Sequence, residues 1–163
     1  MSDFRRSVGY QIYPKSFCDS KGDGLGDLKG VTSKLDYIKE LGVDYIWLTP
    51  FFVSPQNDNG YDVEDYYNID PRYGTMEDFE ELAAEAGKRG IRLVLDMVFN
   101  HTSSRHEWFK KAMEGDEKYK NYYIFRKGKA PGVPPTNWES KFGAGVWEYV
   151  EKFDEYYLHL FDV

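Results

Sequence analysis

The sequence has only one cysteine, Cys18, among its 163 residues. A single cysteine cannot form a disulfide within the chain, which argues against a small secreted scaffold held together by disulfides. No apolar run approaches the roughly 18 residues of a membrane span. The first residues are polar, and no apolar segment of the signal-peptide kind follows them. We therefore expect a cytoplasmic protein with no membrane partner.

Basic residues are in the minority, with 21 Lys and Arg against 28 Asp and Glu, and the formal net charge is −7. An acidic chain releases few counterions from nucleic acid, so we expect no nucleic-acid partner. Aromatic residues, in contrast, make up 18 % of the chain. Such side chains either fill a core or stack on ring-shaped ligands. The length suits one domain but falls short of the roughly 250 residues of a complete (β/α)₈ barrel.

Strand and helix patterns alternate along the first two thirds of the chain. Apolar, β-branched and aromatic runs predict strands at residues 8–13, 43–48 and 91–99. The last of these is nearly continuous in apolar side chains, which predicts burial on both faces. Apolar spacings of three and four predict a helix over residues 28–41 and another between the N-cap Thr75 and Gly90. The order predicts an α/β fold of βα units, in an open sheet or part of a barrel.

The rhythm changes after the third predicted strand. Residues 107–113 predict a short helix, and the rest of the chain carries aromatic clusters separated by turn residues. This composition shift predicts a smaller, irregular, short-stranded subdomain. We therefore divide the chain into a first domain, residues 1–100, and an inserted domain, residues 101–163.

The loop after the first strand, residues 19–27, is rich in Asp and Gly. Alternate acidic residues resemble the start of a calcium loop, in which carboxylates and a backbone carbonyl surround one cation. Lys21 occupies a ligand position, however, and could take the cation's place. The alternative is an acidic turn in which Asp27 caps the following helix. The glycine spacing G-x-G-x-G does not match a dinucleotide-binding loop, so no organic cofactor is expected.

Polar residues also follow the second and third strands, where α/β folds bind ligands. Asp62 beside Tyr61 offers a carboxylate acceptor next to a stacking face, which suits a polyhydroxylated ring; a solvated turn is the alternative. Asp96 lies in an otherwise apolar run and needs a partner. Asn100 and His101 follow it at the predicted strand end, and His101 is either a ligand-facing or a structural histidine.

Four segments resemble, in order, the alpha-amylase family of glycoside hydrolases. Residues 10–17 (YQIYPKSF) resemble its first strand, 58–62 (DNGYD) its second βα loop, 95–102 (LDMVFNHT) its third-strand motif, and 156–161 (YYLHLF) the end of its domain B. The resemblance extends over nearly the whole chain and is greatest for the alpha-glucosidase branch. It implies the N-terminal part of a (β/α)₈ TIM barrel, the first three βα units, with most of the inserted domain B.

The resemblance also implies roles for individual residues. Tyr61 would stack on the sugar ring, and Asp62 would hold its distal hydroxyls. His101 would form a hydrogen bond near the C6 hydroxyl. Phe142 and Phe161 would help to wall the pocket.

A structural Ca²⁺ site is implied as well. Its ligands would be Asp19, Asp23, Leu25 and Asp27. Lys21 departs from the Asn that is usual in this branch.

The implied activity is retaining hydrolysis of α-glucosidic bonds. It uses an Asp nucleophile and a Glu acid/base. In the family the nucleophile follows strand four and the acid/base follows strand five, so both are expected beyond Val163. Asp96 and Asn100 would be structural, and the isolated chain is predicted to be inactive and marginally stable. The implied substrate is an α-glucoside, foremost trehalose 6-phosphate, cleaved to glucose and glucose 6-phosphate. The alternatives are an oligo-1,6-glucosidase (isomaltase) fragment and a non-catalytic sugar-binding remnant.

Overall fold

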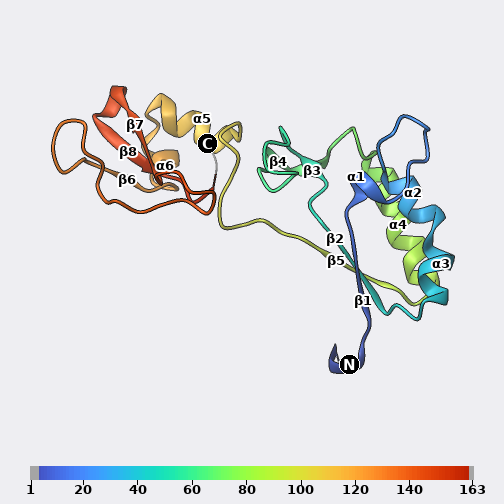
Figure 1. The fold of residues 1–163 in the computed structure, drawn as a ribbon. Helices are drawn as coiled ribbons and strands as arrows, with labels where there is room; N and C mark the ends of the chain where they lie inside the picture. The colour runs from blue at the N-terminus through green and yellow to red at the C-terminus, as the bar shows by residue number, and fades with distance from the viewer. Residues whose placement is uncertain (1–3, 162–163) are drawn as a thin grey trace. The chain divides into compact units, whose positions relative to one another are not determined.

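The computed structural model describes residues 4–161. It contains two compact units, Met1–His101 and Thr102–Val163. Figure 1 labels the helices and strands of both units. No helix within the described residues is long and apolar enough to cross a membrane.

The first unit is built on a three-stranded parallel sheet. Its strands are β1 (Gly9–Ile12), β2 (Tyr45–Leu48) and β5 (Arg92–Leu95), in the spatial order β1-β2-β5. Ile12 pairs with Leu48, and Leu48 pairs with Leu95. The strand ends are therefore level, and the loops that follow all three strands leave the same edge of the sheet. The α/β expectation is confirmed.

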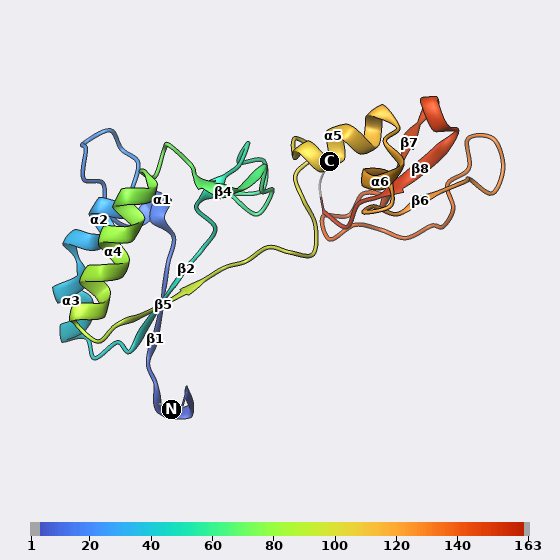
Figure 2. The same ribbon diagram turned by 180° about the vertical axis from the view of Figure 1, so that it is seen from behind.

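The described residues of this unit form four α-helices: α1 (Pro14–Phe17), α2 (Leu28–Ser33), α3 (Leu35–Glu40) and α4 (Met76–Lys88). Helices α2, α3 and α4 lie together on one side of the sheet, as both ribbon views show (Figures 1 and 2). A 3₁₀ turn, η1 (Phe4–Arg6), precedes the first strand. The core forms between these helices and the sheet, and its fully buried members include Ile12, Leu28, Val31, Leu35, Ile38, Ile46, Leu48 and Leu82.

The single helix predicted over residues 28–41 is wrong in detail, because Lys34 interrupts it with φ −105° and ψ 5°. The apolar stripe nevertheless continues across the break, since the Lys34 carbonyl accepts a hydrogen bond from the Ile38 amide at 3.0 Å. Leu41, the last member of the predicted stripe, is 49 % exposed. It lies just past the helix, next to Gly42, whose φ of +79° ends the segment as a C-terminal glycine does.

The third strand is shorter and less buried than predicted. It ends at Leu95, and Val94, Met97 and Phe99 are 40 %, 41 % and 73 % exposed. The prediction of burial on both faces is therefore wrong for the described residues. In the register, Val94 lies beside Trp47, which is also exposed, so this row faces away from the helices.

A small antiparallel pair extends from the loop after β2. Its strands are β3 (Phe52–Val53) and β4 (Asp65–Ile69). Residues 54–64 form the loop that joins them. A separate apolar cluster of Phe52, Val63 and Val98 lies beneath this loop and fixes it to the segment that follows β5.

Up to residue 161, where the description of the second unit ends, it contains two α-helices and a three-stranded antiparallel sheet, as the irregular pattern after residue 99 indicated. Its elements are α5 (Glu107–Glu114), α6 (Glu117–Lys120), β6 (Phe125–Arg126), β7 (Trp147–Val150), the 3₁₀ turn η2 (Glu151–Phe153) and β8 (Glu155–Leu158), with the sheet order β6-β8-β7. Aromatic side chains supply much of its core: Phe109 contacts the rings of Tyr123 and Tyr157 at centroid distances of 5.2 Å and 5.0 Å. Much of the aromatic excess of the sequence is therefore structural.

Candidate functional site

The Asp62 carboxylate occupies the centre of the loop between β3 and β4, and three donors fix its orientation. Oδ1 accepts hydrogen bonds from the Ser54 hydroxyl at 2.7 Å and from the Asp58 amide at 3.2 Å. Oδ2 accepts one from the Asn57 amide at 2.8 Å. A carboxylate has about four acceptor positions, so these contacts leave capacity for one further donor. Asp62 is partly exposed, so a hydroxyl from a ligand can be that donor.

Tyr61 lies next to this carboxylate and bridges to the end of β5. Its hydroxyl donates to Asp96 Oδ2 at 3.1 Å, so Asp96 has the partner that its place in the sequence demands. Burial of the hydroxyl, followed by the negative charge of Asp96, raises the pKa of Tyr61 well above its usual value. The phenol therefore stays protonated and remains a donor over the whole physiological range.

His101 belongs to the same region of the first unit. Burial of the ring lowers the pKa of His101 below its usual value of 6.5. A hydrogen bond with the Tyr61 backbone and the negative charges of Asp58 and Asp62 oppose this effect without cancelling it. The imidazole is thus neutral at pH 7, with one nitrogen able to donate and the other able to accept.

The hydroxyl of Tyr66 anchors the segment that carries this histidine. It lies 2.5 Å from the carbonyl oxygen of Val98 and 2.8 Å from that of His101. The structure therefore brings Tyr61, Asp62 and His101 together, although they come from the ends of two different strands.

Phe142 and Phe161 form a pair within the second unit. Their ring centroids are 6.2 Å apart, with an angle of 57° between the planes. Phe142 is 57 % exposed, so most of its ring is available to a ligand.

In the acidic loop 19–27, aspartate side chains accept hydrogen bonds from backbone amides of the same loop. Asp19 accepts hydrogen bonds from the amides of Lys21, Gly22 and Gly24 at 2.7–2.8 Å, and Asp23 accepts one from the Leu25 amide at 2.9 Å. The amide of Gly24, ahead of the other amides, lowers the pKa of Asp19.

Asp27 is the N-cap of α2, as one alternative had it, because Oδ1 accepts from the Gly30 amide at 2.6 Å. Its Oδ2 accepts from the Ser20 hydroxyl at 2.8 Å. Within residues 4–161 no group of three or more Asp, Glu, His or Cys side chains is placed to hold a metal ion. The Ca²⁺ site stays a prediction.

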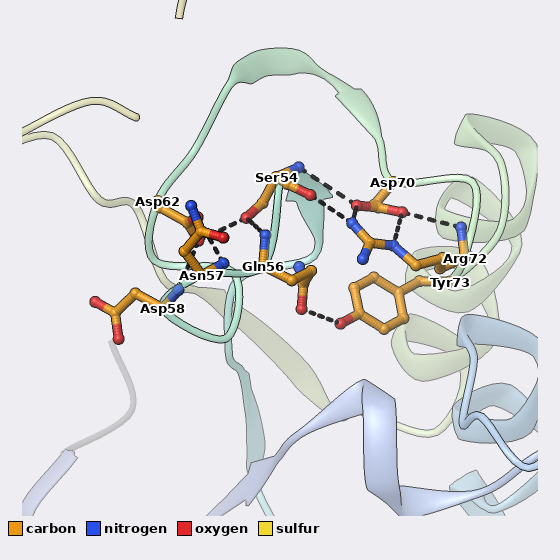
Figure 3. A network of polar contacts seen from close by, with 8 residues as sticks. All are labelled: Ser54, Gln56, Asn57, Asp58, Asp62, Asp70, Arg72 and Tyr73. Carbon is orange, nitrogen blue, oxygen red and sulfur yellow. Dashed lines mark hydrogen bonds and ion pairs between the residues drawn. The ribbon is translucent and has the colours of Figure 1, made fainter. Parts of the chain in front are cut away.

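Sequence reasoning missed the residues that support Asp62 from behind, which are Ser54, Gln56, Asp70 and Arg72 (Figure 3). The β3–β4 pair that carries them was missed too. A signal was present in residues 70–74 (DPRYG): an Asp followed by Pro predicts a turn, and an Arg two positions later can reach back to the carboxylate.

The arrangement offers what a sugar ring requires. It combines an oriented carboxylate for hydroxyl donors, a neutral imidazole that contacts the Tyr61 backbone, and the Tyr61 ring. All three groups are attached to the edge of the sheet where parallel strands end, which is where catalytic barrels bind their ligands.

Comparisons with known proteins agree with this geometry. A profile of the alpha-amylase catalytic domain matches residues 11–163. The trehalose-6-phosphate hydrolase of Bacillus subtilis strain 168 is 56 % identical over 161 residues, which cover 98 % of this chain and 29 % of that protein. The oligo-1,6-glucosidase of Bacillus cereus is 54 % identical over 159 residues, which cover 97 % of this chain and 28 % of that protein.

A solved structure of the trehalose-6-phosphate hydrolase of Bacillus licheniformis superimposes with a TM-score of 0.92 at 59 % identity, over 96 % of this chain and 28 % of that one. The chain thus spans less than a third of the length of these relatives. It corresponds to the N-terminal part of their TIM-barrel catalytic domain, so the predicted fold class is confirmed. The chain belongs to the alpha-amylase family.

Proposed function

We propose that the protein carrying this chain is an alpha-glucosidase-type glycoside hydrolase, and that Tyr61, Asp62 and His101 bind the glucosyl ring of its substrate. The observation that carries this proposal is the fixed Asp62 carboxylate with remaining acceptor capacity, directly beside an aromatic ring. Neighbouring hydroxyls of a sugar donate to such a carboxylate, and the C–H face of the ring packs on the aromatic side chain.

Each residue has a distinct role in the proposal. Tyr61 is the stacking face, and Asp62 accepts hydrogen bonds from the hydroxyls farthest from the cleaved bond. The neutral His101 forms a hydrogen bond with the primary hydroxyl. For Phe142 and Phe161, which pair within the second unit, the support for a sugar contact is the family resemblance. The chemical logic is that these groups hold the ring in place while other groups act on its anomeric carbon.

The reacting carboxylates are assigned to neither Asp62 nor Asp96. Asp62 already accepts three hydrogen bonds, which reduces its nucleophilicity, and Asp96 accepts the Tyr61 hydroxyl. Retaining hydrolysis needs one carboxylate that attacks the anomeric carbon and a second that protonates the leaving oxygen and later deprotonates water. The proposal places both in the part of the catalytic domain that the longer relatives carry beyond this segment.

Trehalose 6-phosphate is the proposed substrate, and the α-1,6-linked glucosides are the alternative. A trehalose-6-phosphate hydrolase and an oligo-1,6-glucosidase match nearly the whole chain at 56 % and 54 % identity. Sequence identity therefore favours trehalose 6-phosphate only slightly. The distinction requires an experiment on the substrate itself.

The test is a substrate panel with the full-length protein that contains this chain. Trehalose 6-phosphate, trehalose, isomaltose and maltose are supplied in turn, and released glucose and glucose 6-phosphate are measured. We expect turnover of trehalose 6-phosphate with glucose first released as the α-anomer, which NMR detects. Isomaltose as the better substrate would favour the oligo-1,6-glucosidase alternative. Binding without hydrolysis of any member would replace the enzyme proposal with that of a sugar-binding protein.

A further inference from the structure

The loop that presents Asp62 is connected to an ion pair whose carboxylate is buried. Arg72 Nε donates to Asp70 Oδ1 at 2.8 Å, and Arg72 Nη2 lies 2.5 Å from Asp70 Oδ2. The pair is therefore bidentate, the geometry in which a guanidinium and a carboxylate hold one another most rigidly. The Asp70 side chain is only 3 % exposed, whereas that of Arg72 is 43 % exposed.

This ion pair forms hydrogen bonds with both the amide and the carbonyl group of Ser54. Asp70 Oδ2 accepts a hydrogen bond from the Ser54 amide at 3.3 Å, and Arg72 Nη2 donates to the Ser54 carbonyl. Ser54 itself is buried, so its backbone groups are shielded from competing water. The peptide groups on either side of Ser54 are thus held by opposite partners of one ion pair.

The side chain of Ser54 connects this fixed backbone to the Asp62 carboxylate. Its hydroxyl donates to Asp62 Oδ1 at 2.7 Å and accepts from the Gln56 amide at 2.9 Å. Figure 3 shows Ser54 between the Asp62 carboxylate on one side and the Asp70–Arg72 pair on the other. The hydroxyl position depends on the Ser54 backbone, and the Asp62 orientation depends on the hydroxyl.

Backbone strain beside Ser54 indicates that the network holds the loop against its intrinsic preference. Gln56 has φ +66°, a left-handed conformation that non-glycine residues seldom adopt. Such a residue persists only where its surroundings over-determine it. Here the Ser54 hydroxyl accepts from the Gln56 amide, and the Tyr73 hydroxyl donates to the Gln56 side-chain oxygen at 3.1 Å.

From these contacts we propose that Asp70 and Arg72 are positioning residues, which act through Ser54 to hold the Asp62 carboxylate in its sugar-binding orientation. The inference rests on the proposed function for the role of Asp62. It goes further in assigning part of the binding energy to two residues that do not touch the ligand. If Asp70 and Arg72 only stabilised the fold, their substitution would lower kcat/KM by the same factor whether or not Asp62 is present.

A double-mutant cycle in the full-length protein separates these two cases. Arg72→Ala lowers kcat/KM for the hydrolysed glucoside by about tenfold or more, mainly through KM. In an Asp62→Ala background the same change lowers kcat/KM less than about twofold, because the carboxylate that it positions is gone. Arg72→Lys, which keeps the charge but not the bidentate contact, restores part of the loss. Equal factors in both backgrounds would overturn the proposal.

The matched control is Arg89, another ion-paired arginine of the first unit. Its guanidinium pairs instead with Asp36 of α3 at 2.6 Å and with Glu85 of α4 at 2.7 Å. We expect Arg89→Ala to change kcat/KM by less than about threefold, and by the same factor with and without Asp62.

Hydrogen exchange provides a readout that needs no substrate. In Arg72→Ala and in Ser54→Ala, the peptide over residues 54–64 exchanges at least about tenfold faster, while Arg89→Ala leaves it unchanged. Ser54→Ala keeps the ion pair and removes only the hydroxyl, so it also covers the case in which Arg72→Ala does not fold. Unchanged exchange in Ser54→Ala would overturn the positioning proposal, whether or not the full-length protein hydrolyses a glucoside. If exchange becomes faster but the protein hydrolyses no glucoside, only the proposed function is refuted.

Discussion

Tyr61 offers two separable contributions, a ring face and a hydroxyl. The hydroxyl donates to Asp96 at 3.1 Å, whereas the ring is the proposed stacking surface. Because the two belong to different parts of one side chain, truncation in steps distinguishes structure from binding.

Tyr61→Phe therefore costs stability and leaves sugar binding largely intact. We expect the free energy of unfolding to fall by about 1 kcal/mol, since one hydrogen bond to a partly buried carboxylate is lost. KM of the full-length protein should change less than about twofold. Tyr61→Ala should raise KM roughly fivefold or more, as the aromatic contact is lost too. Equal KM values for the two variants would argue against stacking on this ring.

His101 makes stability depend on pH. Its folded-state pKa lies below 6.5 because of burial, so the unfolded chain takes up the proton first as pH falls. This contribution to stability is fully present above about pH 6.5 and decreases as pH falls towards the folded-state pKa. His101→Asn should flatten the pH dependence of stability in that window. An NMR titration checks the cause directly, and a folded-state pKa at or above 6.5 would contradict it.

Asp70 also makes stability depend on pH, in a lower pH range. Burial pushes its pKa upward, but hydrogen bonds from Arg72 and charge attraction outweigh burial and leave the pKa below the usual 3.8. The ion pair is therefore complete at every pH at which the protein is expected to work, and its contribution is lost only as pH falls below about 3.8.

At the scale of elements, two glycines in neighbouring helices differ in whether the structure has room for a Cβ atom. A Cβ at Gly30, in α2, would lie 1.9 Å from the Cys18 carbonyl oxygen, which is backbone and cannot turn away. A Cβ at Gly87, near the end of α4, would meet nothing within 4 Å. Helix propensity alone favours alanine at both positions.

We predict that Gly30→Ala destabilises the protein by ~1–3 kcal/mol or more, because α2 must shift away from the chain at Cys18. Gly87→Ala should stabilise it by ~0.5–1 kcal/mol through the usual helix-propensity difference. Thermal unfolding of both variants measures this. A stabilising Gly30→Ala would show that the packing of α2 is looser than described.

Local signals in the sequence predicted much of the first unit. Thr75 caps α4 in a capping box with Asp78, Asp27 caps α2, and Gly42 and Gly90 follow their helices with positive φ. These devices act within a few residues, so a sequence reader can recognise them.

The missed features depend on contacts distant in sequence. Ser54 and Asp70 meet only because β3 pairs with β4, and such short strands carry no periodic signal. The predicted third strand extended too far for the same kind of reason: residues beyond Leu95 are apolar, but the β2 strand beside them ends at Leu48.

For the molecule as a whole, β1 and β5 are the two edges of the parallel sheet in the described residues. Edge strands with apolar side chains tend to pair with other chains. We predict that the 163-residue chain purified alone associates as its concentration rises, which size-exclusion chromatography detects. Val94→Lys, which places a charge on the exposed face of β5, should reduce this. A monomer over the full concentration range would contradict the prediction.

The family and fold follow from the whole chain, whereas the finer assignments remain predictions. The division at residues 100 and 101 as domains A and B, the Ca²⁺ site, the cytoplasmic location and the expected lack of organic cofactor, membrane and nucleic-acid partners all belong to this second group.

The central claim is that Asp62 holds the sugar, and kcat/KM of the full-length protein tests it most directly. Asp62→Asn should lower kcat/KM for trehalose 6-phosphate by about 100-fold or more, equal to ~2.7 kcal/mol of transition-state stabilisation. Asp65→Asn is the matched control, because Asp65 is a carboxylate of the same hairpin that contacts Tyr67 and Asn68, and it should change kcat/KM less than about threefold. Similar, small effects of the two substitutions would contradict the account.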